Sequence, residues 1–224
     1  MNINMKNGAA EILLYEDIGG WFGVTSDAFV KEVKSLGKVS EINLRINSNG
    51  GNVFDGLAIH NYLKSHEARV TVDVDGLAAS IASIIAMAGD EIRMADNAWM
   101  MIHDPWIVTG GTADELRQTA DTMDGVRETL LDTYVKRSSG DREAISDMMK
   151  AETWLNAESA REFGLADSVT HGLKIAASVH REWFKHPPEE LQNADVVVDE
   201  ESPNLDYIKT VIAKQNQVLR RFKL

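Results

Sequence analysis

Residues 76–88 have the sequence GLAASIASIIAMA, in which Ser80 follows small residues and precedes an apolar run. The chain just before it, residues 70–74, alternates valines with polar residues, a period of two that is typical of a β-strand. We therefore predict a strand that ends at Gly76 and an apolar helix over residues 80–88. Ser80 would lie at the junction between the strand and the helix.

The first half of the chain repeats this arrangement. Apolar or alternating patterns predict strands over residues 12–15 and 42–46, and each is followed by a predicted helix, over residues 27–36 and 53–65. Repeated strand-loop-helix units favour an α/β fold with a largely parallel sheet flanked by helices. In such sheets the functional residues lie in the loops beyond the carboxyl ends of the strands.

The second half is predicted to be mainly helical. Thr112 and Glu115 have the spacing of a capping box, which predicts a long helix from there to about Lys136. Two further helices are predicted over residues 142–150 and 157–163, the latter capped by Asn156 and stopped by Gly164. The apolar residues of the long helix are spaced for one face: Leu116, Ala120, Met123, Leu130 and Tyr134.

Composition divides the chain into three parts. Residues 1–185 have the composition of one α/β domain. Residues 186–206 contain seven acidic residues, no lysine or arginine and three of the four prolines, which predicts a solvated acidic linker. Residues 207–224 contain five basic residues and no acid, with apolar residues at helical spacing. We expect a basic amphipathic helix there, which either binds a partner surface or packs back on its own domain.

The overall composition excludes several classes of protein. The chain has 224 residues, of which 44% are hydrophobic and 26% charged, as in a globular protein. It contains no apolar stretch near the roughly 20 residues that cross a bilayer, and its first residues do not resemble a signal peptide, so we expect a cytoplasmic protein without membrane contact. A net charge of −12 argues against nucleic acid as a partner. The absence of cysteine excludes a thiol nucleophile.

Ser80 can be interpreted in two ways. A serine at a helix start is commonly only a cap. As a nucleophile it would need a base and an oxyanion site, and the free backbone N–H of Ile81 at the helix start could supply one donor to that site. Gly50 and Gly51 follow a predicted strand and permit close approach of a ligand, so the N–H of Gly51 could supply the other donor.

His103 is the candidate base. It lies 23 positions after Ser80, at the end of a predicted strand that includes Trp99 and just before Asp104 and Pro105. A histidine at a strand end can face a cleft, and its ordinary pKa suits a general base at neutral pH. The other histidines are expected on the surface, and no cluster has the spacing of metal ligands, so we expect no metal and no cofactor.

With these residues placed, the chain resembles the ClpP-type (caseinolytic) serine peptidases, especially the phage and prophage versions that act as head maturation proteases. The resemblance extends from about Glu11 to Val169. It rests on four segments in the family's order: INSNGG at 46–51, GLAAS at 76–80, MIHDP at 101–105, and WLNAE at 154–158 with FGLAD at 163–167. It implies a crotonase-like α/β fold of repeated β-β-α units with a protruding handle helix.

The resemblance assigns a role to each matching residue. Ser80 is implied to be the nucleophile and His103 the base. The N–H groups of Gly51 and Ile81 are implied to form the oxyanion hole, and an extended peptide substrate would lie along the loop of Gly50 and Gly51.

The third member of the implied triad departs from the family. The family's acid stands two residues before the aromatic position that is Trp154 here, and that place is held by Glu152 in place of the usual aspartate. Asp147 is the reserve candidate. A second departure is Asn49, where the family commonly has proline before the paired glycines.

The implied function is a serine endopeptidase in a homo-oligomeric ring or double ring, heptameric in the family. We expect a phage capsid or scaffold maturation protease, in the bacterial cytoplasm or the phage prohead. The alternative is an ATP-dependent Clp-type subunit that works with an AAA+ unfoldase. Two alternatives come from other classes: a structural ring protein whose site has decayed, and a crotonase-fold acyl-CoA enzyme, against which the pairing of Ser80 with His103 argues.

Overall fold

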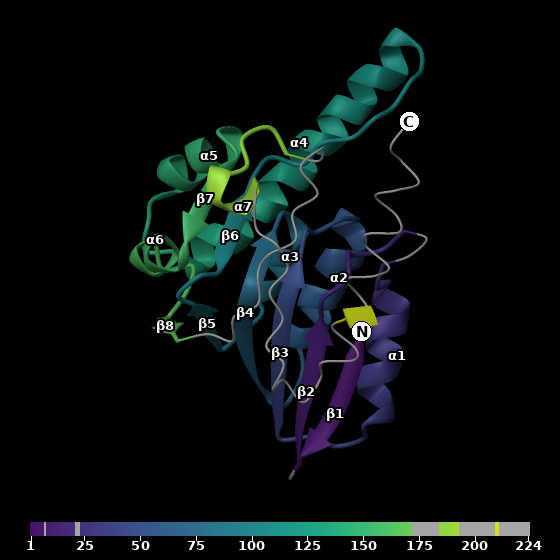
Figure 1. The fold of residues 1–224 in the computed structure, drawn as a ribbon. Helices are drawn as coiled ribbons and strands as arrows, with labels where there is room; N and C mark the ends of the chain where they lie inside the picture. The colour runs from purple at the N-terminus through teal and green to yellow at the C-terminus, as the bar shows by residue number, and fades with distance from the viewer. Residues whose placement is uncertain (7, 21–22, 172–183, 193–208, 211–224) are drawn as a thin grey trace.

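A computed structural model describes residues 1–6, 8–20, 23–171, 184–192 and 209–210 (Figure 1). Most of the predicted linker and of the predicted C-terminal helix lie outside the described residues. Within the described part of the chain, no helix is long and apolar enough to cross a membrane.

Strands and helices alternate through the first half, as expected. The strands are β1 (Asn2–Lys6), β2 (Ala9–Leu14), β3 (Glu41–Ser48), β4 (Arg69–Ala79), β5 (Glu91–Ala95), β6 (Trp99–Ile102), β7 (Thr153–Asn156) and β8 (Ser168–Thr170). The helices are α1 (Ser26–Ser35), α2 (Val53–Lys64), α3 (Ile81–Ala86), α4 (Ala113–Arg137), α5 (Arg142–Lys150), α6 (Ala157–Glu162) and α7 (Glu189–Gln192).

The described strands form one mixed sheet that is mostly parallel. Its main order is β1-β2-β3-β4-β5-β8, with β6 and β7 attached through β4. Only the β1–β2 and β6–β7 pairs are antiparallel. The α/β fold class predicted from the sequence is therefore confirmed.

Strand β4 forks the sheet. Its first half pairs with β5, whereas Leu77, Ala78 and Ala79 pair with β6. The prediction that this strand ends at Gly76 was therefore wrong. Residues 76–79 are buried small or apolar residues that continue the strand, because β6 provides a second partner for hydrogen bonding. No local sequence pattern indicates this second partner.

Helix α3 packs in the centre of the molecule. Every residue of α3 is buried, and it lies between the sheet and helices α2 and α4 (Figure 1). Gly56 of α2 permits this contact, because a Cβ there would lie 2.1 Å from the Ile81 side chain. The sheet, α2 and α4 therefore all pack against α3, which begins directly after Ser80.

Helix α4 has the capping box predicted at Thr112 and Glu115. Its C-terminal half packs on the core through Leu130 and Tyr134, but its N-terminal half extends away from the body (Figure 1). Leu116, predicted on the packed face, is 43% exposed. The spacing of apolar residues therefore continues into the half of α4 that does not pack on the core.

The chain beyond residue 185 is not wholly linker-like. Helix α7 falls in the segment predicted as a solvated linker, and Leu191 within it is buried. Leu191 and Phe184 join a small apolar cluster with Leu77, Ala79 and Met101. The acidic composition gave no indication that Leu191 is buried, because the residues with which it clusters come from β4 and β6.

Candidate active site

The sheet register brings three loops to one edge. Ala79 of β4 pairs with Met101 of the parallel β6, and Ile102 of β6 pairs with Thr153 of the antiparallel β7. The next residue along β4 is Ser80, the next along β6 is His103, and the residue before β7 is Glu152. All three therefore lie at the same edge of the sheet. The strand-end rule predicts this for Ser80 and His103, which follow parallel strands, whereas Glu152 precedes the antiparallel β7.

Ser80 has an unusual backbone. Its φ and ψ are 55° and −128°, and its N–H donates to the Met101 carbonyl at 2.9 Å. Its side chain makes no capping hydrogen bond to α3. Instead Ser80 Oγ lies 2.8 Å from His103 Nε2. The hydroxyl is thus directed away from the helix and toward the imidazole, contrary to the interpretation of Ser80 as only a cap.

The buried hydroxyl groups of Ser83 and Tyr134 support the turn at Ser80. Ser83 Oγ lies 2.5 Å from the Ser80 carbonyl oxygen, 3.2 Å from that of Met101 and 2.7 Å from Tyr134 Oη. Both hydroxyl-bearing side chains are almost completely buried. Sequence reasoning missed Ser83 and Tyr134 as site supports, since neither forms part of a recognisable motif.

The glycine loop lies against the same turn. A Cβ on Gly50 would be 2.7 Å from the Ala79 carbonyl oxygen and 2.8 Å from Ser80 Cβ, and φ of Gly50 is 96°. Only glycine fits this approach without displacing Ser80. Asn49, the departure before the glycines, is buried.

The two N–H groups expected at an oxyanion site are available. The Ile18 N–H donates to the Gly50 carbonyl, and the Asn52 N–H donates to the Ile18 carbonyl. Since neighbouring residues of an extended chain point their N–H groups to opposite sides, the N–H of Gly51 points away from Ile18. Ile81 is the first residue of α3, where a backbone N–H lacks a helical acceptor. Within the described part of the chain, neither N–H has a hydrogen-bond partner.

His103 is half-buried, and its surroundings adjust its basicity. Burial lowers the pKa of His103, while the negative charges of Glu152 and, more weakly, Asp104 raise it, and Lys185 lowers it. Burial is the largest of these effects, so the net pKa lies below the ordinary value. The imidazole is therefore neutral near pH 7 and able to accept a proton.

Glu152 is the carboxylate with the strongest electrostatic effect on His103. It is buried, with 8% exposure, and has a φ of 52°. Its Oε1 accepts hydrogen bonds from the backbone N–H groups of Lys185 and His186, each at 2.7 Å. The reserve candidate, Asp147, is instead exposed and paired with Lys150 at 3.0 Å, so the structure does not bring it to the imidazole.

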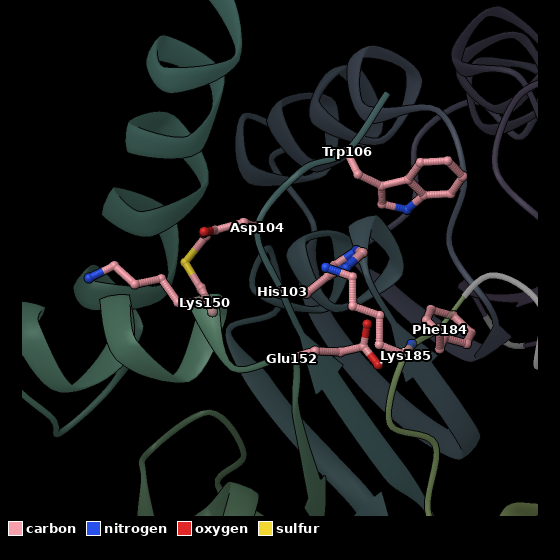
Figure 2. Close-up of a pocket in the computed structure, with 8 residues that line it drawn as sticks. His103, Asp104, Trp106, Lys150, Glu152, Phe184 and Lys185 are labelled. Carbon is pink, nitrogen blue, oxygen red and sulfur yellow. Dashed lines mark hydrogen bonds between the residues drawn. The ribbon is translucent and has the colours of Figure 1, made fainter. Parts of the chain in front are cut away.

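A cavity of about 290 Å³ opens beside these residues (Figure 2). Its walls carry both apolar groups and charges: His103, Asp104, Trp106, Met149, Lys150, Glu152, Phe184 and Lys185. Phe184 meets the His103 ring edge-on at 6.3 Å between centroids and the Trp154 ring at 5.2 Å. Within the described residues, no group of three or more histidine, aspartate or glutamate side chains could hold a metal ion.

Comparison with known proteins assigns this site to a family. The family model described as Clp protease matches residues 25–172, about two thirds of the chain. The chain belongs to the Clp protease family. Ser80, His103, Glu152 and the glycine loop all lie inside the matched region.

Two curated relatives carry the same description, ATP-dependent Clp protease proteolytic subunit 1. The one from Salinibacter ruber is 30% identical over 152 residues, which cover 66% of this chain and 65% of the relative. The one from Protochlamydia amoebophila is 35% identical over 133 residues, which cover 58% of this chain and 65% of the relative. This Clp-family chain thus matches less than two thirds of the length of either relative.

The match to the Clp protease model ends before Phe184. The residues that hold Glu152 Oε1 and pack on His103 therefore lie beyond the matched region. Sequence reasoning placed the domain boundary at residue 185, in the middle of this segment. The signal that was available, Trp183 and Phe184 beside an acidic stretch, does not by itself indicate what those side chains contact.

Proposed function

We propose that this chain is a serine endopeptidase that hydrolyses peptide bonds through an acyl-enzyme on Ser80. The supporting observation is the 2.8 Å separation of Ser80 Oγ and His103 Nε2, with Ser80 held in a positive-φ turn at the start of α3. A hydroxyl within hydrogen-bond distance of a neutral imidazole is the arrangement that activates a serine nucleophile.

The proposed reaction uses four groups in sequence. His103 Nε2 takes the proton of Ser80 as Oγ bonds to the substrate carbonyl carbon, and the N–H groups of Gly51 and Ile81 receive the negative charge on the carbonyl oxygen. His103 then passes the proton to the leaving amine as the peptide bond breaks. Water, activated by His103, releases the acyl group in the same way.

Glu152 is proposed as the third member of the triad. A carboxylate beside the imidazole stabilises the cation that forms when His103 takes the proton, and it orients the ring. Glu152 fits this role better than Asp147, because it is buried beside His103 whereas Asp147 is paired with Lys150 at the surface.

The proposed partners rest on the descriptions of the relatives. Both curated relatives are described as ATP-dependent proteolytic subunits. This favours the expectation that the chain forms a homo-oligomeric ring and works with an ATP-driven unfoldase. Processing of phage capsid or scaffold proteins, our first expectation, has no support in these comparisons and stays a prediction.

Labelling with a fluorophosphonate tests the proposed nucleophile. We expect one covalent modification per chain, on Ser80, located by mass spectrometry of peptides. Ser80→Ala abolishes it, and His103→Ala reduces its rate and the rate of peptide hydrolysis by roughly 10⁴-fold or more. Ser35→Ala, an exposed serine on α1, is the matched control and labels like the wild type.

The same experiment separates the alternatives. An acyl-CoA enzyme of the crotonase type or a decayed ring protein has no activated serine, so the absence of labelling in the native oligomer would reject the peptidase. A second assay tests the ATP-dependent function. Protein that labels at Ser80 is given either a short peptide or a folded substrate, and cleavage of the folded substrate is measured with and without an AAA+ unfoldase and ATP. Equal cleavage of folded substrate without the ATPase would contradict it.

A further inference from the structure

Residues 184–192 are attached to the edge of the active site by apolar contacts. Phe184 and Leu191 are buried in one cluster with Leu77 and Ala79 of β4 and with Met101 of β6. Ala79 directly precedes Ser80, and Met101 lies two residues before His103. The segment therefore rests on the same strand ends that carry the nucleophile and the base, beside β6 and β7 (Figure 1).

Between these two anchors the backbone turns toward Glu152. The N–H groups of Lys185 and His186 both donate to Oε1 of that side chain, each at 2.7 Å. Two consecutive N–H groups on one carboxylate oxygen are charge-assisted hydrogen bonds, stronger than bonds between neutral groups. Figure 2 shows the Glu152 carboxylate beside Lys185, whose side chain extends toward His103.

We propose that residues 184–186 are a positioning element for the active-site acid, which holds the longer side chain of Glu152 in place for His103. This inference rests on the proposed peptidase function. Glutamate has one more rotatable bond than aspartate, so a carboxylate at this position has more conformations in which it misses the imidazole. Both donors bind Oε1, and the other carboxylate oxygen, Oε2, takes part in neither bond.

The position of the segment agrees with this role. It lies outside the region matched by the Clp protease model. It contacts both ends of the His103–Glu152 pair, through the Phe184 ring at one end and the backbone N–H groups at the other. A segment that only covered the site would not need to donate two hydrogen bonds to the acid.

Proline substitution in the full-length chain tests the backbone donors. Lys185→Pro removes one N–H, and Lys185→Ala is its matched control, since both lose the ammonium group but only proline loses the donor. We expect Lys185→Pro to react with a fluorophosphonate about tenfold more slowly than Lys185→Ala, from the strength of a hydrogen bond to a charged group. The pair His186→Pro and His186→Ala repeats the comparison at the second donor.

The pH dependence distinguishes positioning from mere structural support. A mobile Glu152 raises the pKa of His103 less, so the acid limb of the labelling rate shifts to lower pH in the proline variants than in their alanine controls. In a Glu152→Ala background the proline and alanine variants label equally, because the residue through which the donors act is gone.

A measurement on the wild-type fold keeps the inference testable if the proline variants unfold. Hydrogen exchange of the Lys185 and His186 amides, followed by NMR, is slow in the wild type and fast in Glu152→Ala. Equal exchange in both proteins overturns the inference. So do equal labelling rates for proline and alanine variants, or faster labelling by the proline variants, which would indicate a segment that obstructs the site. Failure of wild-type labelling, in contrast, rejects the peptidase itself.

Discussion

Two residues of the site have backbone conformations that their side chains disfavour. Among the described residues, Ser80 and Glu152 are the two non-glycine residues with positive φ, at 55° and 52°. Each such conformation costs about 1–3 kcal/mol relative to an ordinary one. Their occurrence at the proposed nucleophile and acid is consistent with strain that the surrounding structure maintains to aim functional side chains.

The strain at Ser80 predicts a difference between two inactive variants. Ser80→Gly and Ser80→Ala both lose the hydroxyl, but glycine adopts a positive φ without a steric penalty. We expect Ser80→Gly to be more stable than Ser80→Ala by about 1 kcal/mol in chemical denaturation. Equal stability, or a more stable alanine variant, would mean that the turn at Ser80 is not strained.

The charges around His103 predict the direction of a pH shift. The base acts in its neutral form, so the rate rises as pH increases through the pKa of His103. Glu152→Gln removes the strongest group that raises this pKa, so the acid limb moves to lower pH. The plateau falls roughly 10²- to 10⁴-fold, because the imidazolium loses its counter-charge.

The matched control for this pH profile is Asp104→Asn. Asp104 raises the pKa of His103 less than Glu152 does, and it is paired with Arg127 at 2.7 Å. We expect a smaller shift in the same direction with little loss of the plateau. If Asp104→Asn lowered the plateau as much as Glu152→Gln, the assignment of Glu152 as the acid would be wrong.

Among the elements, α3 and α4 are connected by a buried hydrogen bond beneath the site. Tyr134 on α4 meets Ser83 on α3, whose hydroxyl also lies near the carbonyl oxygens of Ser80 and Met101. The half of α4 that packs on the core therefore contributes to the turn that holds the nucleophile. The protruding half of α4 has no such contact with this turn.

This connection predicts the effect of removing one hydroxyl. Tyr134→Phe leaves the ring in place and the Ser83 hydroxyl without its partner on α4, so we expect a loss of about 1–2 kcal/mol in the free energy of unfolding and slower labelling of Ser80. Tyr62→Phe on α2 is the control. Its hydroxyl has no hydrogen-bond partner among the described residues, so its stability changes by less than about 0.5 kcal/mol. Equal effects on stability would contradict the role of the connection.

Element boundaries were predictable where their signals are local. Thr25, Asn52, Thr112, Asp141 and Asn156 cap α1, α2, α4, α5 and α6 with side-chain hydrogen bonds. All five helices are capped where the sequence indicated or begin within a residue of the prediction. Strands β1, β5, β7 and β8 and the extension of β4 to Ala79 were not predicted. The length of such a strand depends on partner strands that are distant in the sequence. The residues of one strand do not indicate which strand pairs with it.

At the scale of the whole molecule, an apolar surface segment between β6 and α4 is exposed in the described part of the chain. Trp106, Ile107 and Val108 are 59%, 55% and 87% exposed, and Leu116 at the protruding end of α4 is also exposed. Contiguous exposed apolar residues of this kind mark sites of protein–protein contact. They agree with the proposed assembly into rings.

We expect this surface to be covered in the oligomer. Val108→Glu places a charge where the next subunit would pack, so native mass spectrometry should detect smaller assemblies than for the wild type. Val108→Thr, which has the same shape with one hydroxyl, is the control and should retain the wild-type mass. An unchanged assembly in Val108→Glu would place the subunit contact elsewhere.

The sequence by itself determined the α/β class, the family resemblance and the residues that meet at the site. These depend on local patterns and on motif order: Ser80 after a small-residue strand, His103 at the next strand end, and Glu152 two residues before Trp154. The tertiary structure alone decided their geometry. The fork of β4 set Ser80 beside His103, and residues far along the chain supplied the N–H groups that hold Glu152. Such pairings depend on which distant segments share a surface, and a linear pattern does not encode that adjacency.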